Sequence, residues 1–387
     1  MTDKEIRLAI KRILSCAAVL CLCLFSASYG AARAPAMSAG ISAPETAAPT
    51  EAPTQMPHPL ENAPAPETPV PEADPEPQYY TFSMIGDCTL ASSIYNVALS
   101  NSYNNTVGDD YAYPFALTRD WFLDDDFTIA NLECVLSNYS VPTDKNFVFR
   151  AVPEYVNILT EGGVDFVTLG NNHVLDYGEQ GYADTKAALD GAGIAYAGRD
   201  EWTICKTGDL TIGVYAVSFG SVASIQAGIQ ALKDNGAEFI IACLHWGDEG
   251  SYDVNALQYE QGHAAIDAGA DIVMGSHPHT LQPYEIYNGH YIYYSMGNWT
   301  FGGNTDPRDK DTVMVRFTVE RLSDGSTSIT DIQNIPCSSS GVMSGNNYQP
   351  VVCEEGSEQY YRVLSKLDGS FDGANLSIGY EYNFNEY

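Results

Sequence analysis

Basic residues are scarce in this chain. Its 387 residues include 18 Lys and Arg against 50 Asp and Glu, which gives a formal net charge of −32. A nucleic-acid-binding protein needs clustered Lys and Arg to neutralise phosphates, and binding to an anionic membrane surface needs the same. The composition therefore argues against both classes. An anionic substrate must be held by something locally positive, and a metal ion is the obvious candidate.

No CxxC pair occurs among the nine cysteines. This absence argues against a thiolate zinc site and against a redox dithiol. Cys88, Cys134 and Cys243 lie in apolar, strand-like runs, where buried free thiols are expected. Cys337 and Cys353 have loop-like surroundings, and a disulfide between them is a hypothesis that the sequence leaves open.

A long apolar run occurs near the start of the chain. Residues 13–29 are apolar or small, and four basic residues precede them between positions 4 and 12. This order is typical of a secretory leader, and the run is also just long enough to span a bilayer. Residues 1–30 are therefore predicted to be a signal peptide or a single-pass membrane anchor. Since the basic residues would stay in the cytoplasm, we expect the rest of the protein to be extracytoplasmic, membrane-anchored or secreted.

Proline is concentrated in one segment. Twelve of the twenty prolines lie between residues 31 and 78, interleaved with Ala, Thr and Glu. Such a segment cannot bury apolar area, so the sequence predicts a disordered, semi-rigid spacer. The alternative is an ordered arm that packs on the domain. Residues 79–387 are then expected to form the folded domain.

Strand-like and helix-like patterns alternate along residues 79–387. This predicts an α/β fold in which helices cover the sheet faces. Helices are expected over 153–160, 180–190, 257–268 and 354–367. Strands are expected over 80–85, 127–132, 164–169, 211–217, 238–244, 271–274, 291–294, 312–319 and 326–332.

Polar side chains follow these strands at their carboxyl ends, where open α/β sheets bind ligands. Taken singly, each has an ordinary structural explanation, such as a turn, a helix cap or a buried hydrogen-bonded histidine. Their common position favours a metal site instead. Mixed oxygen and imidazole ligands suit Zn²⁺, Mn²⁺ or Fe, and a bridging carboxylate would allow two ions and hydrolysis. The candidate metal ligands are Asp87, Glu133, Asn172, His245, His277 and His279.

Four further residues are candidates for catalysis and substrate binding. His173 could act as general acid on the leaving group, and Asp176 could orient its imidazole. Arg150 is a candidate clamp for a carboxylate or phosphate, although a surface salt bridge explains it equally well. Asn298 follows a strand close to the expected site. Three more residues could line the same pocket: Trp246, Ser295 and Trp299.

Seven motifs occur in order along residues 82–303. They are FSMIGDCTL (82–90), IANLECVLS (129–137), FRAVPEYVNIL (149–159), VDFVTLGNNHVLDYG (164–178), CLHWGDE (243–249), GADIVMGSHPHTLQPYE (269–285) and IYYSMGNWTFGG (292–303). Together they resemble the CapA capsule-synthesis (poly-γ-glutamate synthesis) proteins, a branch of the calcineurin-like metallophosphoesterase superfamily. The resemblance implies a four-layer α/β/β/α sandwich with metals at its strand ends.

The resemblance also divides the ligands between two metals. It implies that one ion is held by Glu133, Asn172, His245 and His277, while Asp87, Glu133 and His279 remain for the other. The wider superfamily has Asp-x-His in its first block, where this chain reads Asp-Cys-Thr over 87–89. One ligand of the second ion is therefore missing. We expect one well-occupied metal and a second that is weak or absent.

The function that follows is that of an extracytoplasmic, metal-dependent protein of capsule or cell-envelope polymer synthesis, export or release. The metal-site chemistry makes hydrolysis the expected activity, with a water activated by the metal. Two alternatives stay open. One is a non-catalytic polymer-binding or scaffold subunit of a membrane-bound synthase, and the other is a general envelope phosphoesterase. The expected partners are an anionic envelope polymer or phosphoester substrate and membrane synthase subunits, but not nucleic acid.

Overall fold

The computed structural model describes residues 76–376 of the chain. The expected leader at 1–30 and residues 31–75 of the expected spacer lie outside the described residues, so both stay predictions. Within the described part, no helix is both long enough and apolar enough to cross a membrane.

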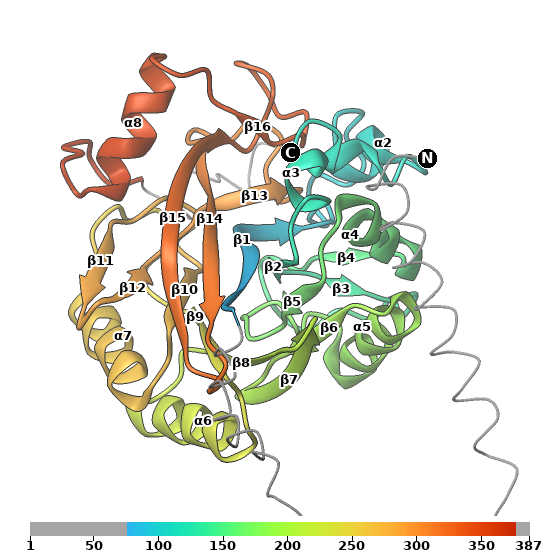
Figure 1. Cartoon of the computed structure of the whole chain (residues 1–387). Helices are drawn as coiled ribbons and strands as arrows, with labels where there is room; N and C mark the ends of the chain where they lie inside the picture. Colours follow the sequence, from blue (N-terminus) through green and yellow to red (C-terminus); the bar gives the residue numbers. More distant parts are fainter. Residues whose placement is uncertain (1–75, 377–387) are drawn as a thin grey trace, which may run out of the picture. The chain divides into compact units, whose positions relative to one another are not determined.

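Two β-sheets form the centre of the domain (Figure 1). The larger sheet contains β1 (Gln78–Thr89), β2 (Phe127–Leu132), β5 (Phe166–Thr168), β6 (Ala195–Ala197), β13 (Asn298–Phe301), β14 (Asp311–Arg321), β15 (Thr327–Ser338) and β16 (Val351–Val352). Its strands run in the order β16-β15-β14-β1-β2-β5-β6, and β13 pairs with β1. Neighbours from β1 to β6 are parallel, so their carboxyl ends meet at one edge.

The smaller sheet has six strands. They are β7 (Glu201–Thr207), β8 (Leu210–Ser218), β9 (Phe239–His245), β10 (Ile272–Ser276), β11 (Tyr284–Tyr287) and β12 (His290–Tyr293). The order is β11-β12-β10-β9-β8-β7, and β8, β9 and β10 are parallel neighbours. A separate two-stranded sheet pairs β3 (Val135–Leu136) with β4 (Arg150–Ala151).

Helices cover the outer face of each sheet (Figure 1). The cluster outside the larger sheet includes residues of α2 (Tyr103–Val107), α3 (Arg119–Phe122), α4 (Val156–Gly162) and α5 (Gly178–Ala192). The cluster outside the smaller sheet includes residues of α6 (Val222–Asp234) and α7 (Ala256–Ala268). Two short 3₁₀ helices, η2 (Tyr113–Phe115) and η3 (Pro153–Tyr155), precede α3 and α4, and α8 (Glu358–Leu367) packs against β14 and β15.

Alternation along the strands builds this layered core. In β9, Phe239 and Ile241 belong to the apolar cluster between the sheets, whereas Ile240 and Leu244 belong to the cluster beneath α6 and α7. Because successive side chains of a strand point to opposite faces, a strand buried on both faces is apolar throughout. Phe82 of β1 meets Phe239 edge to face, with ring centroids 5.6 Å apart, and so joins the two sheets. The predicted α/β fold and its four α/β/β/α layers are confirmed.

Three local expectations were wrong or incomplete. The first strand does not stop at residue 85, because β1 continues to Thr89 with a change of register after Ile85. Helix α6 was not predicted, although its capping box, in which Ser221 and Ser224 each bond the other's backbone N–H, is a recognisable helix start. The hypothesis of a disulfide between Cys337 and Cys353 is also wrong. Both are free thiols, and Cys337 is a buried residue of β15 rather than of a loop.

Candidate metal centre

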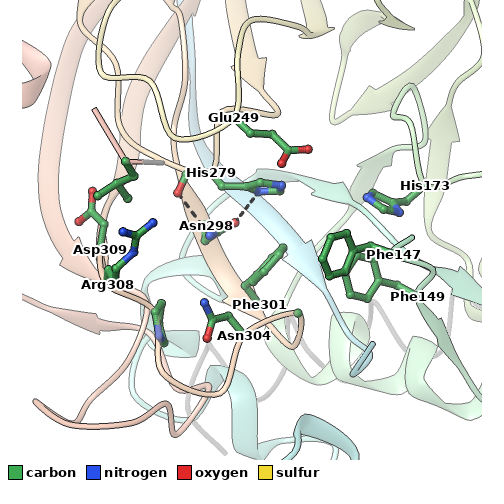
Figure 2. A pocket seen from close by; sticks show the side chains of 13 residues that line it. Phe147, Phe149, His173, Glu249, His279, Asn298, Phe301, Asn304, Arg308 and Asp309 are labelled. Carbon is green, nitrogen blue, oxygen red and sulfur yellow. Dashed lines mark hydrogen bonds between the residues drawn. The ribbon is translucent and has the colours of Figure 1, made fainter. Parts of the chain in front are cut away.

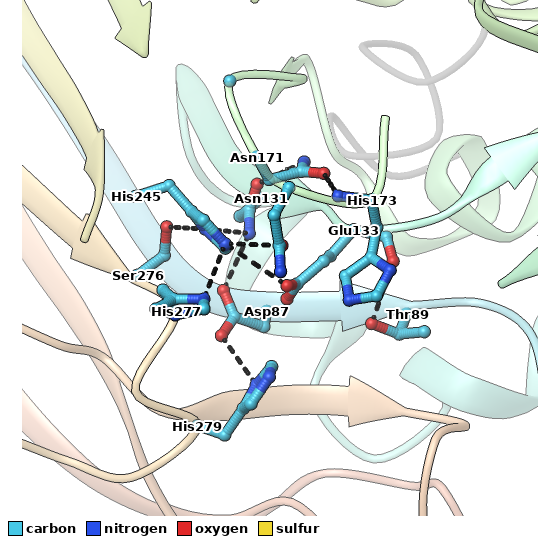
Figure 3. A network of polar contacts seen from close by, with 12 residues as sticks. Asp87, Thr89, Asn131, Glu133, Asn171, His173, His245, Ser276, His277 and His279 are labelled. Atoms are coloured by element: carbon cyan, nitrogen blue, oxygen red, sulfur yellow. Dashed lines mark hydrogen bonds and ion pairs between the residues drawn. The ribbon is translucent and has the colours of Figure 1, made fainter. Parts of the chain in front are cut away.

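The carboxyl ends of strands from both sheets carry the predicted ligands (Figure 3). Asp87 lies near the end of β1, and Glu133 directly follows β2. His245 is the last residue of β9 in the facing sheet. The residues after β5 supply Asn172, and those after β10 supply the two histidines of the His-Pro-His motif. The parallel order of the strands therefore brings together residues that are far apart in sequence.

Two groups of side chains have the spacing of metal sites. Glu133, His245 and His277 form one group, and Asp87, Glu133 and His279 form the other. Within each group, one candidate ligand atom per residue lies within 4.8 Å of the others. Glu133 belongs to both groups, as a bridging ligand would. This division matches the one that the family resemblance implies.

The atoms of the first group converge on one point. Nε2 of His245 lies 3.0 Å from Oδ1 of Asn172, 3.1 Å from Nδ1 of His277 and 3.4 Å from Oε1 of Glu133. The structure thus brings Asn172 to the place where the sequence predicts a fourth ligand. In the second group, Nδ1 of His279 lies 3.3 Å from Oδ2 of Asp87.

Buried carboxylate oxygens without donors make this pocket suitable for a cation. Glu133 is fully buried, and neither of its side-chain oxygens accepts a hydrogen bond. Oδ2 of the buried Asp87 accepts none either. An ionised carboxylate in such a place costs several kcal/mol unless a positive charge compensates it. The carboxylates, the imidazoles and Asn172 together form the mixed donor set that suits Zn²⁺, Mn²⁺ or Fe.

The electrostatics of the site agree with a missing positive charge. Burial, and next the Asp87 carboxylate, raise the pKa of Glu133 well above its ordinary value. Burial opposes protonation of His279, but Glu133 and Asp87 outweigh it and raise the pKa of His279 to about 10. Burial and the neighbouring imidazoles lower the pKa of His245 well below its usual value and that of His277 to about 4. His245 and His277 are therefore neutral, which is the form that binds metals, whereas His279 would have to give up its proton to a metal.

The two histidines after β10 have strained backbone conformations. His277 has φ +98° and His279 has φ +59°. Non-glycine residues in this region cost about 1–3 kcal/mol each and occur mainly where a functional geometry requires them. The sequence motif indicated a ligand pair, but only the structure shows this cost.

A layer of hydrogen bonds orients the ligands (Figure 3). Asn131 donates from Nδ2 to Oδ1 of Asp87 at 2.8 Å, and Asn171 donates to Oδ1 of Asn131 at 3.0 Å. Ser276 Oγ lies 2.8 Å from Nδ1 of His245 and leaves Nε2 for the metal side. Such partners fix the tautomer and orientation of metal ligands. These three residues were not predicted, although each directly precedes a predicted ligand or lies two residues before one.

His173 and Asp176 are in contact, as the sequence predicts for an acid and its orienting residue. Nδ1 of His173 lies 2.7 Å from Oδ2 of the fully buried Asp176. The same carboxylate accepts bonds from Lys145 Nζ and from the Phe149 N–H, both at 2.7 Å. Burial lowers the pKa of His173, although Asp176 acts in the opposite direction. Lys145 was not predicted to lie at the site.

A pocket of about 130 Å³ opens beside the metal ligands (Figure 2). His173 and His279 belong to its wall, as does the predicted substrate-binding residue Asn298, whose Oδ1 lies 3.0 Å from Nδ1 of His279. The remaining lining residues were not predicted to line it. They are Phe147, Phe149, Glu249, Phe301, Gly303, Asn304, Pro307, Arg308, Asp309 and Leu376.

Arg150 is not among the lining residues of that pocket. Its guanidinium donates to the Ser137 carbonyl at 2.8 Å and lies over the Tyr177 ring, 5.3 Å from the centroid. Its role as an anion clamp stays a prediction. The expectation for the two tryptophans is wrong, because Trp246 and Trp299 are buried in the apolar clusters beneath the helices.

Ser295 is also buried, and its hydroxyl donates to the Thr280 carbonyl at 2.6 Å instead of facing the pocket. Thr89 stands where the wider superfamily has a histidine ligand. It is fully buried, and its hydroxyl donates to the Glu133 carbonyl at 3.2 Å. The second group therefore keeps three ligating side chains among the described residues.

The sequence profile of the family described as "bacterial capsule synthesis protein PGA_cap" matches residues 81–303. The chain belongs to this family. The capsule biosynthesis protein CapA of Bacillus anthracis is 27% identical over 333 residues, which cover 78% of this chain and 76% of that protein. The PGA biosynthesis protein CapA of Bacillus subtilis is 30% identical over 238 residues, which cover 54% and 61%. The resemblance to the CapA family is thus confirmed.

Two solved structures that resemble this chain do so at low sequence identity. A purple acid phosphatase from yellow lupin has a TM-score of 0.33 at 12% identity and covers 79% of this chain and 59% of its own. PhoD has a TM-score of 0.34 at 11% identity and covers 77% of each chain. The family assignment rests on the sequence match alone.

Proposed function

We propose that this protein takes part in the synthesis of a capsule or cell-envelope polymer of the poly-γ-glutamate type. In this proposal it works outside the cytoplasm and hydrolyses a bond of the polymer during export or release. Membership of the PGA_cap family supports the polymer class, as do the printed names of the Bacillus relatives. The leader-like residues 1–30 motivate the location.

The observation that carries the hydrolytic part is the buried, donor-free carboxylate of Glu133 between two groups of ligands. Asn172, His245 and His277 would complete one metal site with it, and Asp87 and His279 the other. When bound there, a divalent ion would polarise the scissile group and lower the pKa of a water molecule.

The residues of the chain would handle the leaving group. Asp176 accepts from Nδ1 of His173 and so leaves Nε2 for the pocket that His173 lines. Lys145 and the Phe149 N–H hold Asp176 in place, and the ring of Phe149 packs edge to face on His173 at 4.7 Å. Protonated His173 would give its Nε2 proton to the leaving nitrogen or oxygen.

Elemental analysis of the purified full-length protein tests the metal centre. We expect about one tightly held transition metal per chain, lost in His277→Ala because that imidazole belongs to the first ligand group. His263→Ala is the matched control, since His263 pairs with Glu285 and stacks on Tyr287 away from both groups. A protein that holds no metal, even with added Mn²⁺ or Zn²⁺, would contradict the proposal.

Turnover of a γ-linked glutamate polymer tests the catalytic assignment. We expect His173→Ala to abolish cleavage while metal content stays close to wild type, because His173 touches Asp176 rather than a ligand group. Asp176→Asn should lower the rate less, since the imidazole remains but loses its carboxylate partner. Full cleavage by His173→Ala would show that another group supplies the proton.

A second candidate function is a polymer-binding or scaffold subunit of a membrane synthase. Thr89 favours it, because this buried hydroxyl is engaged by the Glu133 carbonyl and leaves the second group one ligand short of the superfamily pattern. Polymer binding without cleavage by any metal-loaded form would support this function over hydrolysis. Cleavage of nitrophenyl phosphate esters, but not of the polymer, would instead indicate a general envelope phosphoesterase.

A further inference from the structure

A second pocket, of about 570 Å³, borders the metal centre and shares no lining residue with the pocket of Figure 2. The loop after β5 contributes to both pockets, since Asn171 and Asn172 line the second one and His173 lines the first. Figure 3 shows Asn171 and His279, which lines the first pocket, on opposite sides of Asp87. The metal centre therefore has a separate pocket on each of two sides.

Phe219 is an exposed aromatic residue in this second pocket. It directly follows β8, whose last residue, Ser218, pairs with His245 at the end of β9. Phe219 thus lies at the sheet edge that carries the predicted ligands. Its ring meets the ring of His277 edge to face, with centroids 4.9 Å apart, and 54% of the residue is exposed. A half-exposed ring beside a metal ligand offers apolar surface to a bound molecule.

Backbone strain is concentrated around the second pocket and the metal ligands. Among the residues that the structure describes, seven other than glycine have a positive φ, and Phe219 is one of them at +49°. Strained residues of this kind cluster where a functional geometry requires them. Three of the seven line the second pocket and two belong to the candidate ligand groups: Arg199, Asp200, Phe219, His277 and His279.

Hydrogen bonds fix the loop that carries Phe219. The Phe219 N–H donates to the His245 carbonyl at 2.9 Å. The next carbonyl, that of Gly220, accepts from the side chain of Gln261 in α7, and Ser221 then caps α6. Because the backbone is held on both sides of the ring, Phe219 can contact a ligand with little loss of conformational entropy.

The charged side chains of the second pocket already have partners. Arg199 donates to the Glu179 carboxylate at 2.7 Å, and Asp200 accepts from the Tyr215 hydroxyl. The remaining lining residues offer hydroxyl, amide and apolar groups. Such a surface suits the methylene and amide groups of a chain better than an isolated charge. A γ-linked glutamyl unit has two methylene groups next to its chain carbonyl, so it fits a ring that lies beside a metal ligand.

We propose that the polymer passes from one pocket to the other across the metal centre, so that the protein cleaves internal bonds, and that Phe219 packs on the unit that carries the scissile carbonyl. This inference rests on the proposed function and adds the direction of the chain. In hydrolysis, a hydroxide from water joins the carbonyl carbon and the C–N bond breaks. The nitrogen keeps the electron pair and takes a proton from His173, which the proton lost by the water replaces. Because His173 lines the first pocket, the amine fragment leaves there and the new carboxylate forms in the second.

A γ-linked glutamate decamer tests the direction of the chain when it is acetylated at one end and amidated at the other. We expect the metal-loaded, full-length protein to cut this blocked decamer and an unblocked one at similar rates, into fragments of several units. Cleavage of the unblocked decamer alone, with single units released from the start, would overturn the inference. Cleavage of neither would refute the proposed hydrolysis instead, and binding then decides whether the second pocket is a subsite.

Binding of the fluorescently labelled blocked decamer, measured in the first seconds after mixing, tests Phe219 whether or not the chain is cut. The salt concentration should screen general repulsion between the acidic protein and the polymer. We expect Phe219→Ala to weaken binding about fivefold. Phe219→Tyr should bind as wild type does, because it keeps the ring. Metal content should match wild type in both variants, since Phe219 belongs to neither ligand group.

Tyr361→Ala is the matched control. It removes a ring from a residue that is 62% exposed, in α8, and Tyr361 lines neither pocket. Unchanged binding by Phe219→Ala, or equal weakening by Tyr361→Ala, would overturn the assignment of the second pocket. Loss of metal from Phe219→Ala would overturn it as well, because the ring would then only support His277.

Discussion

Replacing Glu133 by glutamine should leave the metal-free protein at least as stable as wild type and remove most of the stabilisation that a bound metal gives. Glu133 is fully buried, is shared by both ligand groups and has no hydrogen-bond donor on either oxygen. Glutamine has nearly the same shape but no charge. The substitution therefore removes a buried carboxylate that accepts no hydrogen bond, without opening a cavity.

The expected change in stability follows from comparing the metal-free with the metal-loaded protein. An uncompensated buried charge costs several kcal/mol, and Asp87 lies close enough to raise the cost further. Metal-free Glu133→Gln should therefore be as stable as wild type or more stable, by up to about 3 kcal/mol. With metal at a hundred times its dissociation constant, wild type gains about 2.7 kcal/mol. The variant should gain much less because it lacks the bridging charge.

The assay is thermal unfolding of the full-length protein in a chelator and in excess Mn²⁺ or Zn²⁺. Glu238→Gln is the control, since Glu238 accepts a bond of 2.6 Å from Arg321 and belongs to neither ligand group. Its stability loss should be the same with and without metal. If Glu133→Gln is destabilised in chelator and still gains the full metal stabilisation, the reasoning is refuted, because Glu133 would then be an ordinary structural acid.

Three further predictions concern the support of the site. Lys366→Met should cost about 3 kcal/mol in urea unfolding, because Asp309 loses its cation and the buried Asp311 keeps Arg362 alone. Burial raises the pKa of Asp311, but Arg362 and Lys366 outweigh burial and hold this pKa below its ordinary value. The ionised carboxylate therefore stabilises the fold above about pH 4. Stability measured at decreasing pH should show this contribution lost as the pH falls further. Gly86→Ala should lower both the melting temperature and the metal content. The added Cβ would lie 1.9 Å from the carbonyl oxygen of Gly297, and residue 86 directly precedes Asp87. An unchanged melting temperature would contradict this close packing.

The sequence predicted the central strands better than the periphery. Strand β9 is buried along its whole length, so its apolar run is unmistakable, and the predicted range nearly coincides with it. The edge strands β7 and β11 are half-buried or exposed and carry little apolar signal. Helix α6 was missed although Ile225, Ile229 and Leu232 recur with helical spacing. Its capping box would have located the start.

The sequence also did not predict correctly which side chains face the pocket. Arg150 lies in a motif near the expected site, and nothing in the residue pattern shows that its guanidinium contacts Ser137 and Tyr177. The burial of Trp246 and Trp299 beneath helices depends on how the sheets pack. An aromatic residue in or just after a strand is equally compatible with the apolar core and with a pocket wall.

The sequence by itself determined the ligand types, their positions at strand ends and the family, because strand periodicity and short motifs are local properties of the chain. The tertiary structure decided which ligand atoms share a site, since β1 and β2 approach β9 and β10 only when the two sheets pack face to face. It also decided that Glu133 lacks hydrogen-bond donors and that Lys366 of α8 pairs with Asp309 between β13 and β14. Burial, charge compensation and orientation depend on neighbours distant in sequence, and these come together only in the folded protein.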